Sequence, residues 1–426
     1  MPDLPVSAAR LLAAADRFGT PTYAYAESAV RERCSALREA VRGLPVKLLY
    51  ALKANPSPAL LQIIRDEGFG FDAVSPGEAA LLARLGVPGR DVLYTTTSTS
   101  DDELRDATGL GVQVNVDDVE RLDRFGQLHP GAEVCVRFNP GLGAGHHRHV
   151  VTAGKEAKFG VPLDQADEVE RIARRHGLRV VGIHQHIGSG IADAADLWPA
   201  AQALIALAPR FPDLRFVDLG GGFHVPYRPG EKPLDLRRLR AEVAEPTLAL
   251  LAELRGSDVP PVELWFEPGR YPVAEAGVLL VRVHTLKPTG PGGRHVFAGT
   301  DSGFNHLIRP TLYDAYHGLV NLSNPRGPLR PYDVVGNVCE SGDLFARQRE
   351  VEELRRGDVL AVLGAGAYGM AMASTYNLRA LPAEVLLRPD GTDVLLRPRL
   401  TPDALTDQLL TQTAGWERRE AVLPAG

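Results

Sequence analysis

Eight β-rich runs alternate with amphipathic segments over the first two thirds of the chain, and this alternation limits the possible folds more than any other feature. The runs fall near residues 46–50, 70–74, 91–95, 112–116, 133–138, 180–186, 215–219 and 262–266. Between them, segments such as PGEAALLARLG and LDQADEVERIARRHG carry apolar residues at helical spacing and end on glycine, a common helix terminus. Parallel strands need crossovers of this length, so eight such units predict an α/β fold, a closed (β/α)8 barrel.

After about residue 275 the pattern changes to β-rich runs without long helices between them. The runs are VLLVRVHTLK, RHVFAGT, YDVVGNVC, DVLAVLG and AEVLLRPDGTDVLLRP, in which RPDGTD has the residues of a hairpin turn. The strand-like PTYAYAE near the N-terminus is outside the eight units and is expected to join this second sheet. We therefore predict an N-terminal segment at 1–37, the barrel at 38–275 and a mostly β domain at 276–426.

Composition and charge argue against several classes of function. A net charge of −6 disfavours binding to nucleic acid or to an anionic membrane. No stretch reaches the roughly 18 apolar residues of a membrane-spanning helix, and MPDLPVSAAR lacks the features of a signal peptide. Cys34, Cys135 and Cys339 are widely spaced and form neither a disulfide framework nor a zinc pattern. We expect a cytoplasmic protein.

Lys53 is unusual because the chain uses arginine almost wherever it needs a positive charge. Only six of the 47 basic residues are lysine. Lys53 follows the first predicted barrel strand, and the active site of such a barrel lies at the C-terminal ends of its strands. A lysine amine can form a Schiff base with an aldehyde, which arginine cannot do. The structural alternative is a lysine that merely extends its charge into solvent from a strand end.

Polar and glycine-rich segments end other predicted strands and should meet Lys53 at the same rim. They are FDAVSPGE after the second strand, HQHIGSG with His186 and Ser189 after the sixth, DLGGGF with Gly220, Gly221 and Gly222 after the seventh, and FEPGRY with Glu267 and Gly269 after the eighth. Loops after the last two strands of such barrels often bind phosphate through backbone N–H groups. A carboxylate can keep a pyridine nitrogen protonated. An amine, a phosphate cradle and a carboxylate together predict pyridoxal 5'-phosphate.

The histidine-rich GHHRH at 145–149 suggests a metal site at first sight. Its histidines have no matching carboxylate or cysteine cluster nearby in the sequence. We predict a loop there and no metal.

Eight short motifs occur in a familiar order along nearly the whole chain: YALKAN, KFG at 158–160, HIGSG, GGG, EPGR, RPTLYDAYH, CESGD and GAYG. In this order they resemble the diaminopimelate decarboxylases, which belong to the alanine-racemase-like, fold type III class of pyridoxal 5'-phosphate enzymes. The resemblance implies decarboxylation of meso-diaminopimelate to L-lysine, the last step of lysine biosynthesis.

The resemblance also implies a role for each matching residue. Lys53 carries the cofactor, His186 stacks on its ring and Glu267 faces the ring nitrogen. The other cofactor contacts fall to Ser189, Gly221, Gly222, Gly269, Arg270 and Tyr368. Substrate contacts fall to Arg270, Arg309, Tyr313, Glu340 and Tyr368. Cys339 is the proton donor and reaches the site from the partner subunit, so a homodimer with active sites at the interface is expected.

One segment departs from the family pattern and leaves the choice of substrate open. YTTTSTSDDEL at 94–104 lacks the Asn/Lys-containing version of typical members. The main alternative is a sister decarboxylase for D-ornithine, D-lysine or an intermediate of specialised metabolism. An amino-acid racemase is disfavoured by Glu267, because racemases benefit from a weaker electron sink. A non-catalytic cofactor-binding protein is disfavoured because such proteins resemble the barrel alone.

Overall fold

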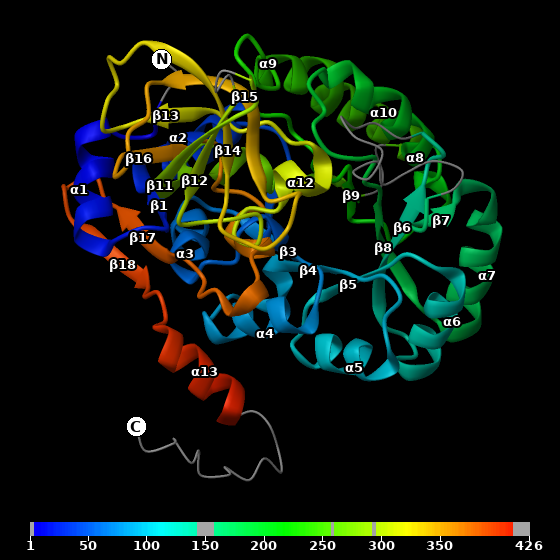
Figure 1. The fold of residues 1–426 in the computed structure, drawn as a ribbon. Coiled ribbons are helices and arrows are strands. Elements are labelled where there is room, and N and C mark those ends of the chain that lie inside the picture. The colour runs from blue at the N-terminus through cyan, green and yellow to red at the C-terminus, as the bar shows by residue number, and fades with distance from the viewer. Residues whose placement is uncertain (1–3, 143–156, 257–259, 292–294, 412–426) are drawn as a thin grey trace.

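In the computed structural model, two sheets organise the chain, and Figure 1 shows the barrel beside the second sheet. The structure describes residues 4–142, 157–256, 260–291 and 295–411. The GHHRH segment at 145–149, predicted to be a loop without metal, lies outside these residues.

Eight parallel strands form a closed barrel, which confirms the predicted (β/α)8 architecture. Neighbouring strands pair in chain order, and the pairing of β10 with β2 closes the ring. The short strand β7 (Val161–Pro162) is not part of the ring and pairs in parallel with the end of β6. The barrel strands are β2 (Val46–Ala51), β3 (Gly70–Ala73), β4 (Val92–Thr95), β5 (Gln113–Val116), β6 (Glu133–Asn139), β8 (Arg179–His184), β9 (Phe216–Asp218) and β10 (Glu263–Phe266). The first and last residues of each strand lie within two residues of the ends of the corresponding predicted run.

Amphipathic helices cover the outside of the barrel, as the sequence pattern predicts. Their ends follow from local chemistry: Ser100 and Glu103 form a capping box at the start of α5, and α7 ends at Gly177 in the left-handed conformation. The covering helices are α2 (Glu27–Ala40), α3 (Pro58–Asp66), α4 (Pro76–Arg84), α5 (Asp101–Gly109), α6 (Val119–Leu128), α7 (Ala166–His176), α8 (Trp198–Ile205), α9 (Leu236–Arg238) and α10 (Glu245–Arg255), with a π-helical turn at Leu239–Ala244 before α10.

The second sheet is mostly antiparallel, and its main path runs β15-β14-β12-β11-β1-β17-β18. These strands are β1 (Thr22–Ala26), β11 (Gly277–Thr289), β12 (His295–Thr300), β14 (Leu329–Val335), β15 (Leu344–Glu352), β17 (Ala383–Leu387) and β18 (Asp393–Arg397). Off this path, β16 (Val359–Val362) pairs with β11, and β13 (Leu319–Asn321) pairs with β16. The N-terminal strand β1 lies between β11 and β17, and every one of its residues is buried. The antiparallel pairing of β17 with β18 confirms the RPDGTD hairpin.

Four further helices complete the described chain. Leu11, Ala14 and Ala15 of α1 (Ala8–Phe18) pack on one face of the second sheet. The short helices α11 (Arg270–Val273) and α12 (Arg309–Tyr313) begin with the arginines predicted to bind substrate. In Figure 1, α13 (Pro402–Thr411) projects away from both sheets. No helix among the described residues is both long enough and apolar enough to cross a membrane.

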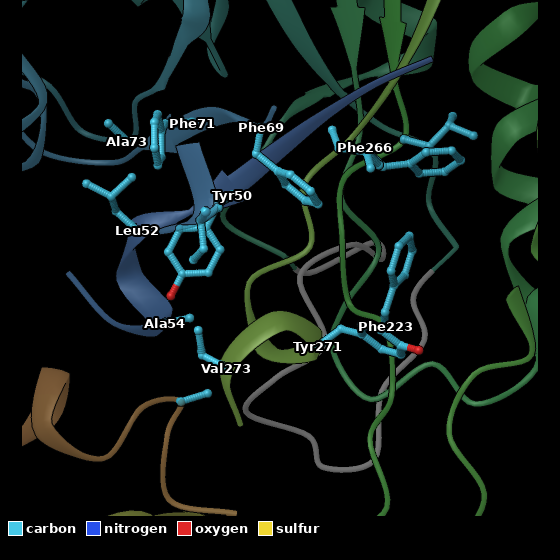
Figure 2. Close-up of a cluster of buried hydrophobic side chains, with 14 of the residues drawn as sticks. Tyr50, Leu52, Ala54, Phe69, Phe71, Ala73, Phe223, Phe266, Tyr271 and Val273 are labelled. Atoms are coloured by element: carbon cyan, nitrogen blue, oxygen red, sulfur yellow. The ribbon is translucent and has the colours of Figure 1, made fainter. Parts of the chain in front are cut away.

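Apolar packing holds the segment that carries Lys53. Figure 2 shows Tyr50, Leu52 and Ala54 around the end of β2, with Val273 of α11 close to Ala54. These side chains are buried, and burial of a large apolar side chain contributes about 1.5–3 kcal/mol. The end of the first barrel strand is therefore fixed by the core on both sides of the lysine.

Candidate active site

Lys53 lies on a short 3-10 turn, Leu52–Ala54, directly after β2, and we call this segment the lysine turn. Its two flanking residues are fully buried, yet 40% of the Lys53 side chain is accessible. The apolar neighbours anchor the backbone while the amine faces open space at the C-terminal end of the barrel. Lys53 Nζ lies 3.1 Å from Oδ2 of Asp72, which is carried by β3.

Carboxylates around Lys53 determine its charge. Burial alone would lower the pKa of Lys53, but the nearby Asp72 and Glu267 outweigh this effect and raise the pKa above its ordinary value. Burial and the charge of Glu267 in turn raise the pKa of Asp72. The free site therefore holds Lys53 as an ammonium group between two buried acids.

Glu267 follows β10 and has one carboxylate oxygen that lacks a partner. Its side chain is 4% exposed, and Oε2 accepts a hydrogen bond of 3.3 Å from His184 Nε2. Oε1 has no hydrogen-bond partner among the described residues. Burial raises the pKa of Glu267, and the positive charges of Lys53 and Arg137 partly offset this effect. A buried acceptor without a partner is costly, so the oxygen is suited to a donor from a bound molecule, such as the ring N–H of pyridoxal phosphate.

Asp218 of β9 lies beside Glu267 and accepts a hydrogen bond of 2.7 Å from the Gly220 N–H. Burial and the charge of Glu267 raise the pKa of Asp218 well above its ordinary value. A metal ion could also fit here by distance alone. The side chains of His184, Asp218 and Glu267 each offer one potential ligand atom, and these atoms lie within 4.8 Å of one another. The positive charges of Lys53 and Arg137, which act on this group, oppose a metal cation there.

The glycine triplet after β9 brings three rim loops into close contact. Gly222 has φ +92, and a Cβ on it would lie 2.2 Å from the Gly188 carbonyl oxygen. A Cβ on Gly221 would lie 2.0 Å from the Glu267 carbonyl oxygen. Only glycine therefore allows the loops after β8, β9 and β10 to approach this closely. Gly269 packs equally closely against the lysine turn, where its Cβ would meet Ala54 Cβ at 3.2 Å.

His186 is held as a neutral ring beside this triplet. Its Nδ1 accepts a hydrogen bond of 3.3 Å from the Gly221 N–H. Burial and the charge of Lys53 lower the pKa of His186 well below its ordinary value. An uncharged ring in a fixed orientation suits stacking on a cofactor.

Arg270 and Arg309, the arginine pair, are buried without an acidic partner. Arg270 donates to Ser189 Oγ at 3.0 Å and to the Tyr227 hydroxyl at 2.8 Å. Arg309 is 2% exposed and donates to His317 Nε2 at 3.0 Å. Within the described part of the chain, neither guanidinium forms an ion pair with a carboxylate. Two buried cations without counter-ions make this region suited to bind anions. Tyr313 lies close enough to act electrostatically on Arg270.

Tyr368 connects the second domain to the lysine turn. Its N–H donates a hydrogen bond of 2.7 Å to the Ala54 carbonyl oxygen, and its ring lies 4.9 Å from the Arg270 guanidinium. The residue has φ +57, a left-handed conformation that costs a non-glycine residue of order 1–3 kcal/mol. Such conformations cluster at functional sites, where the surrounding structure maintains them.

Cys339 and Glu340 are both exposed, and their described contacts are not with the other predicted site residues. The Cys339 N–H donates to Asn377 Oδ1 at 3.1 Å, and Glu340 Oε1 accepts from the Tyr376 hydroxyl at 2.6 Å. The structure thus brings most predicted site residues together within one chain, namely Lys53, His186, Ser189, Gly221, Gly222, Glu267, Gly269, Arg270, Arg309, Tyr313 and Tyr368, but it does not bring Cys339 and Glu340 to them.

Sequence reasoning missed six residues of the site: Asp72, Arg137, His184, Asp218, Tyr227 and His317. The first four share a signal that could have found them. Each is a polar residue at or near the C-terminal end of an apolar barrel strand, where the side chain reaches the rim. His317 ends the RPTLYDAYH motif, eight residues after Arg309, so that motif was its signal. Tyr227 lies in a loop and carries no comparable local signal.

Known proteins share this fold and these motifs. Residues 27–274 match the family described as pyridoxal-dependent decarboxylase, pyridoxal binding domain. The diaminopimelate decarboxylase of Methanothermobacter thermautotrophicus is 42% identical over 403 residues, which cover 92% of each chain. A crystal structure of diaminopimelate decarboxylase superimposes with a TM-score of 0.87 at 33% identity, covering 97% of this chain and 99% of the other. The diaminopimelate decarboxylase of Helicobacter pylori, crystallised with L-lysine, has a TM-score of 0.84 at 31% identity, with coverage of 94% and 99%. The chain therefore belongs to the diaminopimelate decarboxylase family of pyridoxal-dependent enzymes.

Proposed function

We propose that this enzyme decarboxylates meso-diaminopimelate to L-lysine with pyridoxal 5'-phosphate, as the last step of lysine biosynthesis. The arginine pair carries this proposal, because it places beside the lysine turn two buried guanidiniums that have no counter-ion among the described residues. A substrate with two carboxylates supplies the missing charges. The relatives named above are diaminopimelate decarboxylases, and one of them was crystallised with L-lysine.

The residues around Lys53 suit the cofactor. Lys53 would hold it covalently through Nζ, and Glu267 Oε1 would accept a hydrogen bond from the protonated ring nitrogen. His186 stacks on the ring, while the cofactor's other contacts are made by Ser189, Gly221, Gly222, Gly269, Arg270 and Tyr368. When bound, pyridoxal phosphate would supply a sink for the electron pair that departing CO2 leaves on the α-carbon. Glu267 supports this step because its carboxylate keeps the ring nitrogen protonated.

Substrate recognition is assigned to groups at the other end of the site. Arg309 binds the distal carboxylate, for which its planar fork is suited. Arg270, Tyr313 and Tyr368 line the same region, and Glu340 binds the distal ammonium group. These contacts would fix the orientation of the substrate and so decide which carboxylate departs.

We propose a homodimer in which each subunit completes the site of the other. The exposure of Cys339 and Glu340 supports this arrangement, since neither makes its described contacts with the site residues of its own chain. In the dimer, Cys339 of the partner subunit donates a proton to the α-carbon after CO2 has left. All three cysteines are free thiols, in keeping with a cytoplasmic location.

The atypical segment at 94–104 lies on the barrel rim between β4 and α5. Thr95, Thr96 and Thr99 are buried, and the Thr96 N–H bonds to the Asn115 carbonyl oxygen at 3.1 Å. Because the segment borders the site, it keeps a sister decarboxylase for D-ornithine or D-lysine as the second candidate.

Release of CO2 over a panel of amino acids tests the proposal. The panel contains meso-diaminopimelate, both enantiomers of lysine and both enantiomers of ornithine. We expect meso-diaminopimelate to have the highest kcat/KM. An unpaired buried charge costs roughly 2–5 kcal/mol, so the preference should be about 30- to 5,000-fold. Faster decarboxylation of a lysine or an ornithine would instead favour the second candidate. Inversion of the α-carbon without CO2 release would identify a racemase.

A further inference from the structure

Tyr227 is shared by the two members of the arginine pair, which come from different domains. Its hydroxyl accepts the 2.8 Å hydrogen bond from Arg270, which follows barrel strand β10. Its ring lies 4.7 Å from the guanidinium of Arg309, which begins α12 in the second domain. Tyr227 itself belongs to the loop after β9. A single side chain thus contacts both cations across the boundary between the domains.

The surroundings of Tyr227 fix its position. Its N–H donates to Glu231 Oε2 at 2.9 Å, which holds the loop, and its ring packs edge-on against His317 at 5.5 Å. A Cβ added to Gly364 of the second domain would lie 3.0 Å from Tyr227 Cε1, so the ring also contacts that backbone closely. The barrel loop therefore holds the backbone of Tyr227, while the second domain packs against its ring.

His317 supports Arg309 from the other side. Its Nδ1 lies 2.7 Å from the Leu363 carbonyl oxygen and must donate to it, which leaves Nε2 as the acceptor for Arg309. Arg309 is therefore held between a neutral imidazole and the face of Tyr227, an arrangement that attracts a guanidinium without neutralising it.

Two neighbouring guanidiniums repel each other, and the charge of Arg270 acts directly on Arg309. A hydroxyl between them relieves this repulsion because it offers an acceptor, while the ring offers its negative face. The same two charges lower the pKa of the Tyr227 hydroxyl, although burial alone would raise it. Tyr227 is thus the group that lets two unpaired cations remain side by side before an anion arrives.

We propose that Tyr227 is a positioning residue that determines specificity: it holds Arg270 and Arg309 as one anion-binding pair, and so selects amino acids that carry a second carboxylate. This inference rests on the proposed function. Tyr227 acts through the arginines and does not take part in the bond-breaking step. Its loss should weaken the binding of carboxylate-bearing ligands more than it slows the chemistry.

Tyr227→Phe tests the proposal because it removes one oxygen atom and keeps the ring. Hydrogen bonds to charged groups contribute enough that KM for meso-diaminopimelate should rise about 10- to 100-fold, with kcat changed by less than about threefold. Product inhibition separates the roles further. L-Lysine keeps the distal carboxylate, so its Ki and its calorimetric Kd should rise by a similar factor. Pentane-1,5-diamine has no carboxylate, and its Ki should not change.

Tyr332→Phe is the matched control. Tyr332 is also buried and its hydroxyl accepts a 3.1 Å hydrogen bond from the Leu354 N–H, but it lies in the second sheet on β14. This variant should keep the KM and Ki values of the unmodified enzyme.

The following results would overturn the proposal. An unchanged KM in Tyr227→Phe, or a loss confined to kcat, would show that the hydroxyl does not position the pair. Equal weakening of lysine and the diamine would show that the effect is not directed at carboxylates. Loss of cofactor absorbance or of cooperative melting would assign Tyr227 a structural role instead. If the proposed function itself is wrong, the unmodified enzyme will release no CO2 from meso-diaminopimelate, which is seen before any substitution is made.

Discussion

Single residues at this site take their chemical state from burial and from neighbouring charge. Lys53 is kept protonated by Asp72 and Glu267, whereas His186 is kept neutral by burial and by Lys53. Glu267 combines a buried carboxylate with an oxygen that has no partner among the described residues. The states of His186 and Glu267 suit the proposed chemistry directly, as a stacked neutral ring and an acceptor for a ring N–H, whereas Lys53 must first lose its proton before its amine can form the covalent link.

Lys53→Ala should abolish the covalent link to the cofactor, because no other amine is expected at that position. Reduction of the holoenzyme with borohydride, followed by peptide mapping, should label Lys53 in the unmodified enzyme and no lysine in the variant. Lys47→Ala is the control, since Lys47 lies on β2, the strand that precedes the lysine turn, but pairs with Asp91 at 3.3 Å. Labelling of another lysine in Lys53→Ala would show that the assignment is wrong.

His317→Gln should change how stability depends on pH. Burial and the charge of Arg309 lower the pKa of His317 to about 3, below the ordinary value of 6.5. The neutral ring therefore contributes stability that is fully present above about pH 6.5 and is lost as the pH falls through about 3. Over this window the free energy of unfolding of the variant should fall less steeply, by up to about 1.4 kcal/mol per pH unit.

Denaturant titrations at pH 7, 6, 5 and 4 measure this dependence. His284→Gln is the control because His284 is 56% exposed on β11, and it should keep the slope of the unmodified protein. Equal slopes for His317→Gln and the unmodified protein would contradict the prediction.

At the scale of elements, the site depends on how closely loops approach one another. The glycine triplet lets the loop after β9 pack between the loops after β8 and β10, and the lysine turn packs against Gly269. The hydrogen bond from Tyr368 to Ala54 adds a loop of the second domain to this contact. The rim is therefore one packed unit built from separate elements, and a change in one loop should move the others.

Gly222→Ala should disrupt this unit, because the added Cβ must displace the Gly188 carbonyl. Gly230→Ala provides the control: Gly230 has a similar φ of +86, but a Cβ there meets nothing within 4 Å. Both variants place alanine at a similar positive φ. The difference in stability between the two variants therefore reflects the steric contact at Gly222. We expect Gly222→Ala to lose about 1–3 kcal/mol more stability than Gly230→Ala and to bind cofactor at least about tenfold more weakly. Thermal melting and titration of cofactor absorbance measure both effects, and equal results for the two variants would refute the idea.

The barrel could be predicted from the sequence because each strand and helix has its own local signal. β2 and β8 each contain a short apolar run, and α7 has both an amphipathic pattern and a terminal glycine. The strands β13 and β15 were not predicted. β13 has three residues, and β15 carries charged side chains because half of it faces solvent. The local sequence signal for a strand is weak where the strand is short or lies at a sheet edge.

The candidate site could be predicted only in part, for a similar reason. Residues next to strand ends, such as Lys53 and Glu267, are located once the barrel is assumed. Tyr227 becomes a site residue only through contacts between distant parts of the chain, which no local pattern reveals. The roles assigned to all of these residues remain predictions.

At the scale of the whole molecule, the proposed dimer explains why two predicted site residues lie on the surface. Cys339 and Glu340 are exposed in one chain, while Lys53 and the arginine pair lie at the rim of the barrel. The domain boundaries at residues 37 and 275 also remain predictions.

Mixing two inactive variants tests the dimer. Lys53→Ala supplies an intact Cys339, and Cys339→Ala supplies an intact Lys53, so a mixed dimer has one complete site. After subunit exchange, about a quarter of the full activity should return, since half of the dimers are mixed and each has one working site of two. Mixing Lys53→Ala with the double variant Lys53→Ala/Cys339→Ala is the control and should restore nothing. No recovery after exchange has been demonstrated would argue against a shared site.

The central position of β1 in the second sheet has a consequence for how the protein is made. The two strands that pair with β1 are β11 and β17. Both are encoded at least about 250 residues later in the chain. At about 5–20 residues per second, the ribosome needs roughly 10 to 50 seconds to produce the first of them. All the barrel strands emerge in that interval, so the barrel can close before β1 finds a partner. During synthesis the nascent chain therefore carries a strand destined for complete burial with its edges still open.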